Sequence, residues 1–361
     1  MSKIAHEYSP LKICHYIEWL KLRRSGHILA PVHVQISPTN RCNHHCIYCA
    51  YRISEYPSSE KFNPKDEIPF SDINRILVDA AASGTKAVQI TGGGEPLMHP
   101  NIAEILELSA SLGLSIGLVS NGARMTSELA DFLGREATWV RISLDSGENY
   151  THSLIHGTSQ NDWDKVISGI DYLVQAKHKY RSNIVIGIGF VVCKENIFNI
   201  KVAALVAKHL GVDSIRFSMA FTGEVSGGLS DERIKQITKE LCEAKLISDA
   251  NFKVFDFFPS RLVDSSSLVQ YYLYCATKDV SMYVGADINL YSCCTLAYNK
   301  RGQIASLKNQ TIMDALRSSD VIKFFESHNP STRCHNACMY REKNEMAEYL
   351  LMDSPPHLEF V

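Results

Sequence analysis

The feature that most constrains this chain is a group of three cysteines, Cys42, Cys46 and Cys49, spaced C-x3-C-x2-C. A cubane [4Fe-4S] cluster has four irons, and an ordinary ferredoxin-type cluster is closed by four cysteines. Three thiolates in one short loop therefore leave one iron without a protein ligand, where a substrate or cofactor can bind. A three-ligand zinc site, or part of a zinc knuckle, is the alternative that this spacing allows.

The segments that follow predict a parallel α/β fold. Residues 32–37 alternate and are β-branched, which is typical of a strand, and residues 70–82 predict a helix with Ser71 as its N-cap. Further strands are expected at residues 86–91, 115–120, 139–144, 184–192 and 214–219. Helices are expected between them at residues 101–112, 127–133, 163–177 and 197–210. Six strand–helix units in a row require crossover connections, and such sheets keep their chemistry beyond the carboxyl ends of the strands.

A glycine-rich segment, residues 92–96 (GGGEP), comes directly after the second expected strand. Glycine lets the backbone approach a ligand closely, because no Cβ intervenes. The segment lacks the lysine and the following Ser or Thr of a phosphate-binding P-loop. A tight turn between strand and helix is the structural alternative.

Together the two motifs resemble the radical SAM superfamily over about residues 30–222. The family signature is C-x3-C-x2-C with an aromatic residue before the last cysteine, a place that Tyr48 fills, and a G-G-E-P motif after strand two. The resemblance implies a partial (β/α)6 barrel that binds a catalytic [4Fe-4S] cluster through Cys42, Cys46 and Cys49, with S-adenosylmethionine (SAM) on the open iron. The residues that it places around SAM are Tyr48, Gly93, Gly94, Glu95, Asn121, Ser143, Asp145 and Arg216.

Some of these assignments have structural alternatives. Ser143 and Asp145 can simply cap the end of a strand, and Arg216 can belong to a structural ion pair instead of binding the SAM carboxylate. Cys193 is expected at the mouth of the barrel, where a thiol can donate a hydrogen atom to a substrate radical, as an epimerase requires. A small, buried apolar cysteine is nevertheless the expected role of Cys193, and the same expectation holds for Cys14 and Cys242.

A second group of cysteines lies in the last quarter of the chain. A β-hairpin is expected between Cys275 and Cys293, and the C-x3-C pair Cys334 and Cys338 is expected to open a helix that runs to residue 351. This arrangement resembles the twitch module, the short form of the C-terminal SPASM extension, and implies an auxiliary [4Fe-4S] cluster bound by these four cysteines. Cys294 competes with Cys293 for one place, Ile288 stands where the module usually has glycine, and a zinc ribbon is the alternative for the whole site.

The chain is therefore divided into a helical lead-in (1–30), the barrel (31–222), a linker helix and strand (223–270) and a twitch-like module (271–361). A turn-rich loop at residues 221–228 and a helix capped by Ser230 begin the linker. The net charge of −2 gives no sign of binding to nucleic acid, and no apolar run suggests a membrane span or signal peptide. A cytoplasmic location is expected, in which eleven cysteines indicate metal binding rather than disulfides.

The leading interpretation is an enzyme that generates a 5′-deoxyadenosyl radical and removes hydrogen from an unactivated C–H bond of a small biosynthetic substrate. The auxiliary cluster would accept an electron, which makes the net reaction an oxidation, although epimerisation stays open. The absence of a recognisable leader-binding domain favours a small molecule over a ribosomally made peptide, which would be epimerised or cross-linked. A flavodoxin-type or ferredoxin-type electron donor is implied by the resemblance alone. A non-catalytic iron-sulfur or zinc protein is the alternative of another class.

Overall fold

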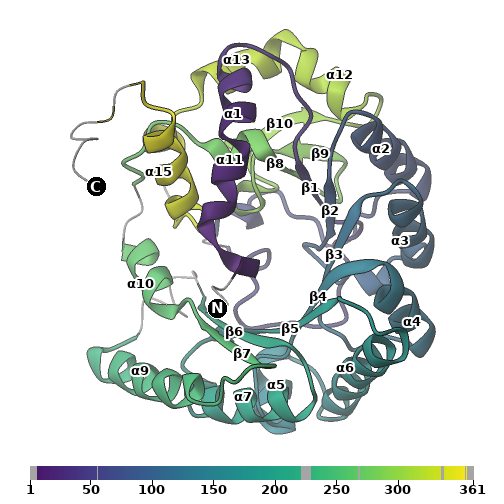
Figure 1. Ribbon diagram of the computed structural model, residues 1–361, viewed down its shortest axis with the longest axis vertical. Helices are drawn as coiled ribbons and strands as arrows, with labels where there is room; N and C mark the ends of the chain where they lie inside the picture. The colour runs from purple at the N-terminus through teal and green to yellow at the C-terminus, as the bar shows by residue number, and fades with distance from the viewer. Residues whose placement is uncertain are drawn as a thin grey trace.

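The computed structural model describes residues 6–54, 56–220, 229–266, 269–334, 337–353 and 355, and the loop expected at 221–228 lies outside them. One curved sheet of ten strands runs through the protein, in the order β10-β9-β8-β1-β2-β3-β4-β5-β6-β7, with helices around its outer side (Figure 1). The predicted α/β class with a parallel sheet is confirmed. Among the described helices, none combines the length and the apolar character needed to cross a membrane.

The parallel part of the sheet is longer than predicted. Its strands are β1 (His33–Ile36), β2 (Ala87–Ile90), β3 (Ser115–Ser120), β4 (Ala137–Ser143), β5 (Val185–Val192), β6 (Ser214–Met219), β7 (Lys253–Asp256) and β8 (Ser281–Val284). β7, from the expected linker, pairs with β6, and β8, from the expected C-terminal module, pairs with β1. β9 (Asn289–Tyr291) and β10 (Gln303–Ser306) complete the sheet in antiparallel fashion, so the expected hairpin is extended by a third strand.

Helices cover the outer face of the sheet because each helix has one apolar side and each strand places alternate apolar residues on that face. In α2 (Phe70–Ala82) the side chains of Ile73, Ile76, Leu77 and Ala80 are buried, one helical face toward the sheet. The other helices of this layer are α3 (Ile102–Ser111), α4 (Ser127–Glu136), α6 (Asn161–Tyr180), α7 (Ile200–His209) and α9 (Asp231–Lys245). The opposite face of the strands looks into the barrel and carries the polar side chains of the site.

Two local predictions are wrong. Ser71 is not the N-cap of α2, because the helix begins at Phe70 behind Pro69 and has no side-chain cap. The sequence interpretation also missed α5 (Asn149–His156), which lies between β4 and α6. Three of the side chains buried in α5 are polar, so it lacked the apolar stripe by which a helix is recognised.

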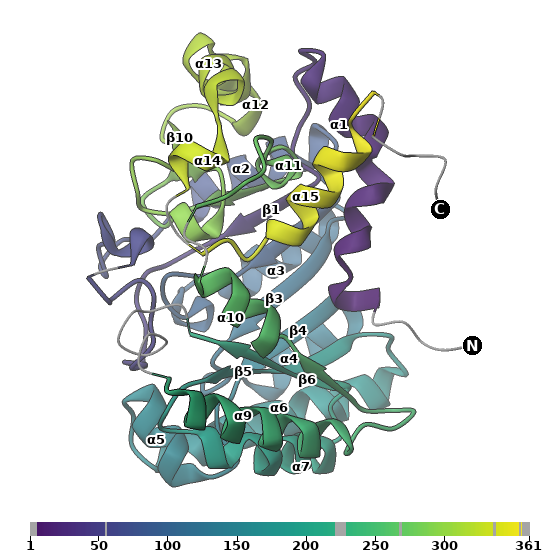
Figure 2. The same ribbon diagram turned by 90° about the vertical axis from the view of Figure 1, so that its left-hand side faces the viewer.

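The two ends of the chain pack against each other. The N-terminal segment forms η2 (Pro10–Tyr16) and α1 (Ile17–Arg24), and α1 lies beside α15 (Arg341–Leu350) in both views (Figures 1 and 2). Leu20 of α1 shares a small apolar cluster with Ala276 and Ala347. The remaining short elements are η1 (His6–Tyr8), η3 (Pro57–Ser59), η4 (Pro96–Met98), η5 (Ile197–Asn199), α10 (Phe258–Ser266), α11 (Ala276–Val280), η6 (Cys294–Leu296), α12 (Ile312–Arg317), α13 (Ser319–Ser327) and α14 (Pro330–Arg333).

Candidate active site

The three cysteines of the first motif lie in the long loop after β1, at the carboxyl edge of the sheet. All three are half-buried and none forms a disulfide. Burial raises the pKa of Cys42 to about 12 and raises that of Cys49 as well, so a thiolate here requires a compensating positive charge. A cationic metal centre supplies such a charge, and three sulfur donors on one loop fit the three-cysteine cluster that the sequence predicted.

The glycine motif after β2 packs directly on this cysteine loop. The backbone N–H of Gly94 donates to the Thr39 carbonyl (3.2 Å), and that of Glu95 donates to the Arg41 carbonyl (2.8 Å). A Cβ on Gly94 would lie 2.2 Å from the Arg41 carbonyl oxygen. A glycine is therefore required at position 94 for packing as well as for the predicted contact with a ligand, because any side chain would keep the two loops apart.

The side chains of Glu95 and Asn121 hold neighbouring loops together. The buried Glu95 carboxylate accepts from Ser120 Oγ (2.7 Å) and from the Asn121 backbone N–H (2.7 Å). Asn121 Nδ2 in turn donates to Asn43 Oδ1 in the cysteine loop, at 2.9 Å. Because the Glu95 carboxylate is occupied, the predicted contact of Glu95 with SAM would be made by its backbone, as the resemblance implies. The role of Asn121 in binding SAM stays a prediction.

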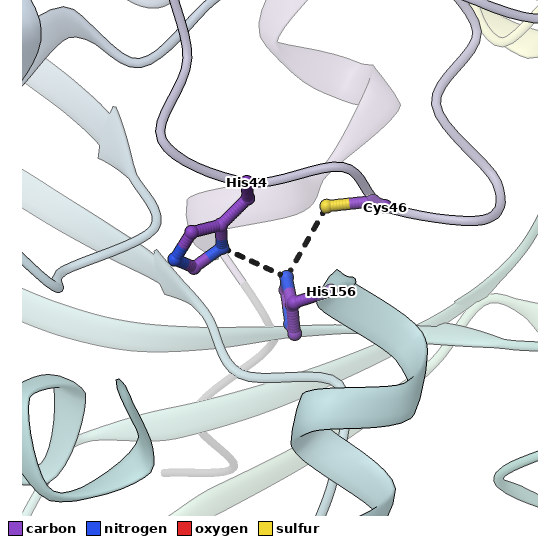
Figure 3. A group of neighbouring side chains, drawn as sticks. All are labelled: His44, Cys46 and His156. Atoms are coloured by element: carbon purple, nitrogen blue, oxygen red, sulfur yellow. Dashed lines mark hydrogen bonds between the residues drawn. The ribbon is translucent and has the colours of Figure 1, made fainter. Parts of the chain in front are cut away.

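A buried network of histidines adjoins Cys46, and the sequence interpretation did not find it. His156 Nδ1 lies 3.2 Å from Cys46 Sγ and 3.2 Å from His44 Nδ1 (Figure 3). His44 Nε2 lies 2.8 Å from Asp162 Oδ2, and His152 is 3.5 Å from the same oxygen. His44, Cys46 and His156 could also hold a metal ion between them. The H-H sequence inside the cysteine motif was a usable signal, but its partners come from α5 and α6.

The protonation of His156 follows from its neighbours. Burial alone would lower the pKa of His156, but the Cys46 sulfur and the Asp145 carboxylate raise it to about 10. Its Nε2 faces the Asp145 carboxylate at 3.3 Å and the Leu144 carbonyl at 3.2 Å. A protonated imidazole therefore fits between these oxygens and the sulfur, with an N–H toward each side.

Asp145 joins the end of β4 to the cysteine loop. It is fully buried, has a φ of +55°, and accepts hydrogen bonds from the Tyr48 hydroxyl and the Val191 backbone N–H. Burial and the nearby carboxylate raise the pKa of Tyr48 well above its usual range, so the phenol stays a donor. Both Asp145 oxygens already have protein donors, so a ribose contact would share one of them. Tyr48 and Asp145 are joined by this hydrogen bond, and their contacts with SAM stay a prediction.

We expect Asp145→Ala to lower the free energy of unfolding by about 3 kcal/mol, because it leaves two buried donors unpaired and puts alanine in the left-handed region. Asp145→Asn keeps an acceptor and tolerates the same φ, so about 1 kcal/mol is expected. Urea unfolding of both variants measures the difference. Equal midpoints for Asp145→Ala and the wild type would show that these hydrogen bonds contribute no net stability.

The other predicted residues are placed as follows. Ser143 is half-buried on the inner face of β4, opposite Gly189 of β5, and Arg216 is on the inner face of β6. Cys193 follows β5 and is fully buried, and burial raises its pKa well above the usual range, so its role as hydrogen donor stays a prediction. Cys14 and Cys242 are exposed on surface helices, so the expectation of buried apolar cysteines is wrong for them.

The second cysteine group gathers around one cavity. Cys275, Cys293, Cys334 and Cys338 all line it, although they come from α11, the β9 end and the approach to α15. Cys294 does not line it and instead lies 3.2 Å from the Tyr340 hydroxyl. Ser292 Oγ and His328 Nδ1, also in the cavity wall, are buried and lack a hydrogen-bond partner in the described part of the chain.

These observations fit a bound metal group. Burial raises the pKa of Cys275 and Cys334 to about 12, and four such thiols need a metal to ionise together. Tyr272 donates a hydrogen bond of 3.0 Å to Cys338 Sγ. Ile288, where the twitch module usually has glycine, has a φ of +61°, so this β-branched residue adopts a conformation that costs about 1–2 kcal/mol.

Comparisons with known proteins agree with this picture. The Radical SAM superfamily model matches residues 36–199. GTP 3′,8-cyclase of Clostridium acetobutylicum is 33% identical over 141 residues, 38% of this chain and 42% of that enzyme. AdoMet-dependent heme synthase of Methanosarcina barkeri is 28% identical over 196 residues, 54% of this chain and 52% of that enzyme. The chain thus spans about half the length of the curated relatives that it matches.

Solved structures share the fold over nearly the whole chain. SuiB of Streptococcus suis bound to S-adenosylmethionine superposes with a TM-score of 0.64 at 15% identity, covering 93% of this chain and 77% of that one. The likeness in fold therefore extends beyond the matched family segment. Residues 36–199 thus match the Radical SAM superfamily model, within an α/β chain that shares its fold with SuiB.

Proposed function

We propose that this protein is an enzyme that cleaves SAM reductively and removes a hydrogen atom from an unactivated C–H bond of its substrate. The observation that carries the proposal is the direct packing of the glycine motif on the cysteine loop at the carboxyl edge of β1 and β2. A [4Fe-4S] cluster held on this loop, once reduced by a flavodoxin-type or ferredoxin-type donor, would supply the one electron that cleaves the SAM sulfonium to methionine and a 5′-deoxyadenosyl radical.

The residues of this chain bind and orient the reactants. Cys42, Cys46 and Cys49 would hold the cluster, and the backbone of residues 93–95 would bind the methionine group of SAM. The Tyr48–Asp145 pair ties the end of β4 to the loop, which fixes the distance between the SAM site and the inner face of the barrel. His156 donates toward Cys46 Sγ, and hydrogen bonds of this kind tune the reduction potential of a cluster.

The cavity of the second cysteine group is proposed to hold an auxiliary [4Fe-4S] cluster through Cys275, Cys293, Cys334 and Cys338. The unpartnered Ser292 and His328 atoms in its wall support a bound group there. A fully ligated cluster would accept the electron left on the substrate, which favours a net oxidation over epimerisation. A structural zinc ion, which four thiolates also suit, is the competing assignment.

Two substrate classes compete, and each has support. The names of the curated relatives refer to small molecules, GTP and heme, which favours a small biosynthetic substrate. SuiB, however, has also been solved with the precursor peptide SuiA, and in that complex it covers 96% of this chain with a TM-score of 0.63. This fold likeness favours a ribosomally made peptide as the second candidate.

The test is SAM cleavage after anaerobic reconstitution, with iron and sulfide measured on the same samples. About eight irons and production of 5′-deoxyadenosine are expected for the wild type. A Cys42/Cys46/Cys49→Ala variant should keep about four irons and lose cleavage entirely. The double variant of the exposed Cys14 and Cys242 to alanine is the matched control and should behave as the wild type does. Iron binding without SAM cleavage in the wild type would contradict the proposal and favour a non-catalytic iron-sulfur protein.

A further inference from the structure

The inner face of the barrel carries two arginines on strands that flank β5. Arg141 alternates with the buried core residues Val140 and Ile142, so its side chain is on the opposite, inner face of β4. Arg216 stands between the core residues Ile215 and Phe217 on β6 and is inward for the same reason. Parallel pairing puts Arg141 opposite Gly187 and Arg216 opposite Gly189, one layer apart in the barrel.

Glycines on the intervening strand bring the two guanidinium groups together. Gly187 and Gly189 are the inward positions of β5 at this level, and they have no side chain to fill the space. A Cβ on Gly189 would lie 3.6 Å from Arg141 Cδ, so the Arg141 side chain lies across β5 toward β6. Burial and the proximity of Arg141 together lower the pKa of Arg216 to about 9. The two like charges are thus neighbours on the inner face, where both side chains are half-buried.

The protein provides no anion for this pair in the part of the chain that the structure describes. Arg216 Nε is buried and has no hydrogen-bond partner there, and neither arginine is in an ion pair. The Asp145 carboxylate, which partly counters the lowering of the Arg216 pKa by burial, already accepts from Tyr48 and Val191. Removing a charged group from water is costly unless it is paired, and the half-buried Arg216 has its Nε fully inaccessible to solvent. Two unpaired guanidinium groups on an inner face therefore indicate that a ligand supplies the anion.

The neighbouring residues show where in the barrel the arginine pair lies. Arg216 lies over the ring of Tyr8 with its Cζ 5.4 Å from the centroid, and Tyr8 packs on Phe255 at 4.9 Å. Tyr8 of the N-terminal segment, packed on Phe255 of β7, thus covers this end of the interior. Arg141 is four residues before Asp145, about 13 Å along an extended strand. The pair is therefore inside the barrel, below the loop edge where the SAM contacts are proposed.

We propose that Arg141 and Arg216 bind the anionic group, a carboxylate or a phosphate, of the substrate. Guanidinium groups bind both anions through paired hydrogen bonds in a fixed geometry. This inference rests on the proposed function, because it names the substrate class of the same enzyme. It requires that the substrate carries at least one negative charge, and that the charged end lies deep in the barrel with the reacting C–H bond toward the cysteine edge.

The experiment measures anion binding to the reconstituted full-length protein without reductant, so it is independent of SAM cleavage. Phosphate, pyrophosphate and citrate are titrated at constant ionic strength, with thermal shift and calorimetry as readouts. At least one of them should bind the wild type, and both Arg141→Gln and Arg216→Gln should weaken that binding about tenfold or more. Arg141→Lys and Arg216→Lys keep the charge but lose the paired geometry and should give an intermediate loss. Arg135→Gln, an exposed arginine on α4 beside Tyr180, is the matched control.

A parallel titration separates the substrate from the carboxylate of SAM as the source of the anion. Binding of SAM and of decarboxylated SAM is compared in the same variants. If the variants lose affinity for SAM but not for decarboxylated SAM, the pair binds the SAM carboxylate and the proposal fails. It fails as well if no probe anion binds the wild type, or if binding is equally strong in the Gln variants. Because these results need no radical chemistry, a failure here leaves the test of SAM cleavage unaffected.

Discussion

Replacing Cys293 by alanine is expected to remove the proposed auxiliary cluster, whereas replacing its neighbour Cys294 is expected to leave it in place. Cys293 lines the cavity together with Cys275, Cys334 and Cys338, but Cys294 faces Tyr340 and the sulfur of Met339. Cys293 is the extended residue before η6 and Cys294 is the first residue of that helix, and only Cys293 lines the cavity. Iron in Cys293→Ala should fall from about eight to about four per chain, and Cys294→Ala should keep about eight.

The measurement is iron, sulfide and zinc content after anaerobic purification, together with SAM cleavage. The catalytic cluster is bound elsewhere, so Cys293→Ala should still cleave SAM while substrate oxidation is lost. Loss of iron in Cys294→Ala but not in Cys293→Ala would reverse the assignment. If Cys293→Ala loses zinc and no iron, the site is a zinc site, and the net reaction would then be expected to be redox-neutral.

Gly94→Ala is the second change with a large expected effect. Its Cβ would lie 2.2 Å from the Arg41 carbonyl oxygen and 2.4 Å from the Asn40 carbonyl carbon, and backbone atoms cannot move aside cheaply. The substitution should therefore separate the glycine motif from the cysteine loop, break the bond between Gly94 N and Thr39 O, and displace Cys42. We expect SAM affinity and SAM cleavage to fall by about a hundredfold, in line with a misplacement of about 1 Å.

Gly113→Ala is the control for this substitution. Gly113 has a φ of +72° between α3 and β3, but nothing lies within 4 Å of its Cβ position. Alanine there brings backbone strain of about 1 kcal/mol without a clash, so stability should fall slightly while iron content and SAM cleavage persist. SAM binding is measured by equilibrium dialysis on reconstituted protein. Unchanged SAM binding in Gly94→Ala would mean that the close contact of the two loops is not required for the site.

Much of the fold could be predicted from the sequence because its signals are local. The apolar alternation of residues 184–192 predicted β5, and the spacing of residues 70–82 predicted α2 within a residue. The helix α5 could not be found in this way, because three of its buried side chains, Thr151, His152 and His156, are polar and form hydrogen bonds with other segments of the chain. Hydrogen bonding to distant partners makes such side chains suitable for burial, and a single segment does not show those partners.

The sequence by itself determined the two cysteine groups, the glycine motif and the parallel α/β order, since short spacings and periodicity within one segment specify them. The tertiary structure decided which of Cys293 and Cys294 faces the cavity, how α5 brings His156 to Cys46, and that β8 joins the barrel sheet beside β1. It also decided the pairing of Arg141 and Arg216 across β5. The physical reason is that these contacts join residues tens to hundreds of positions apart, and only the order and register of the strands bring them within reach of one another.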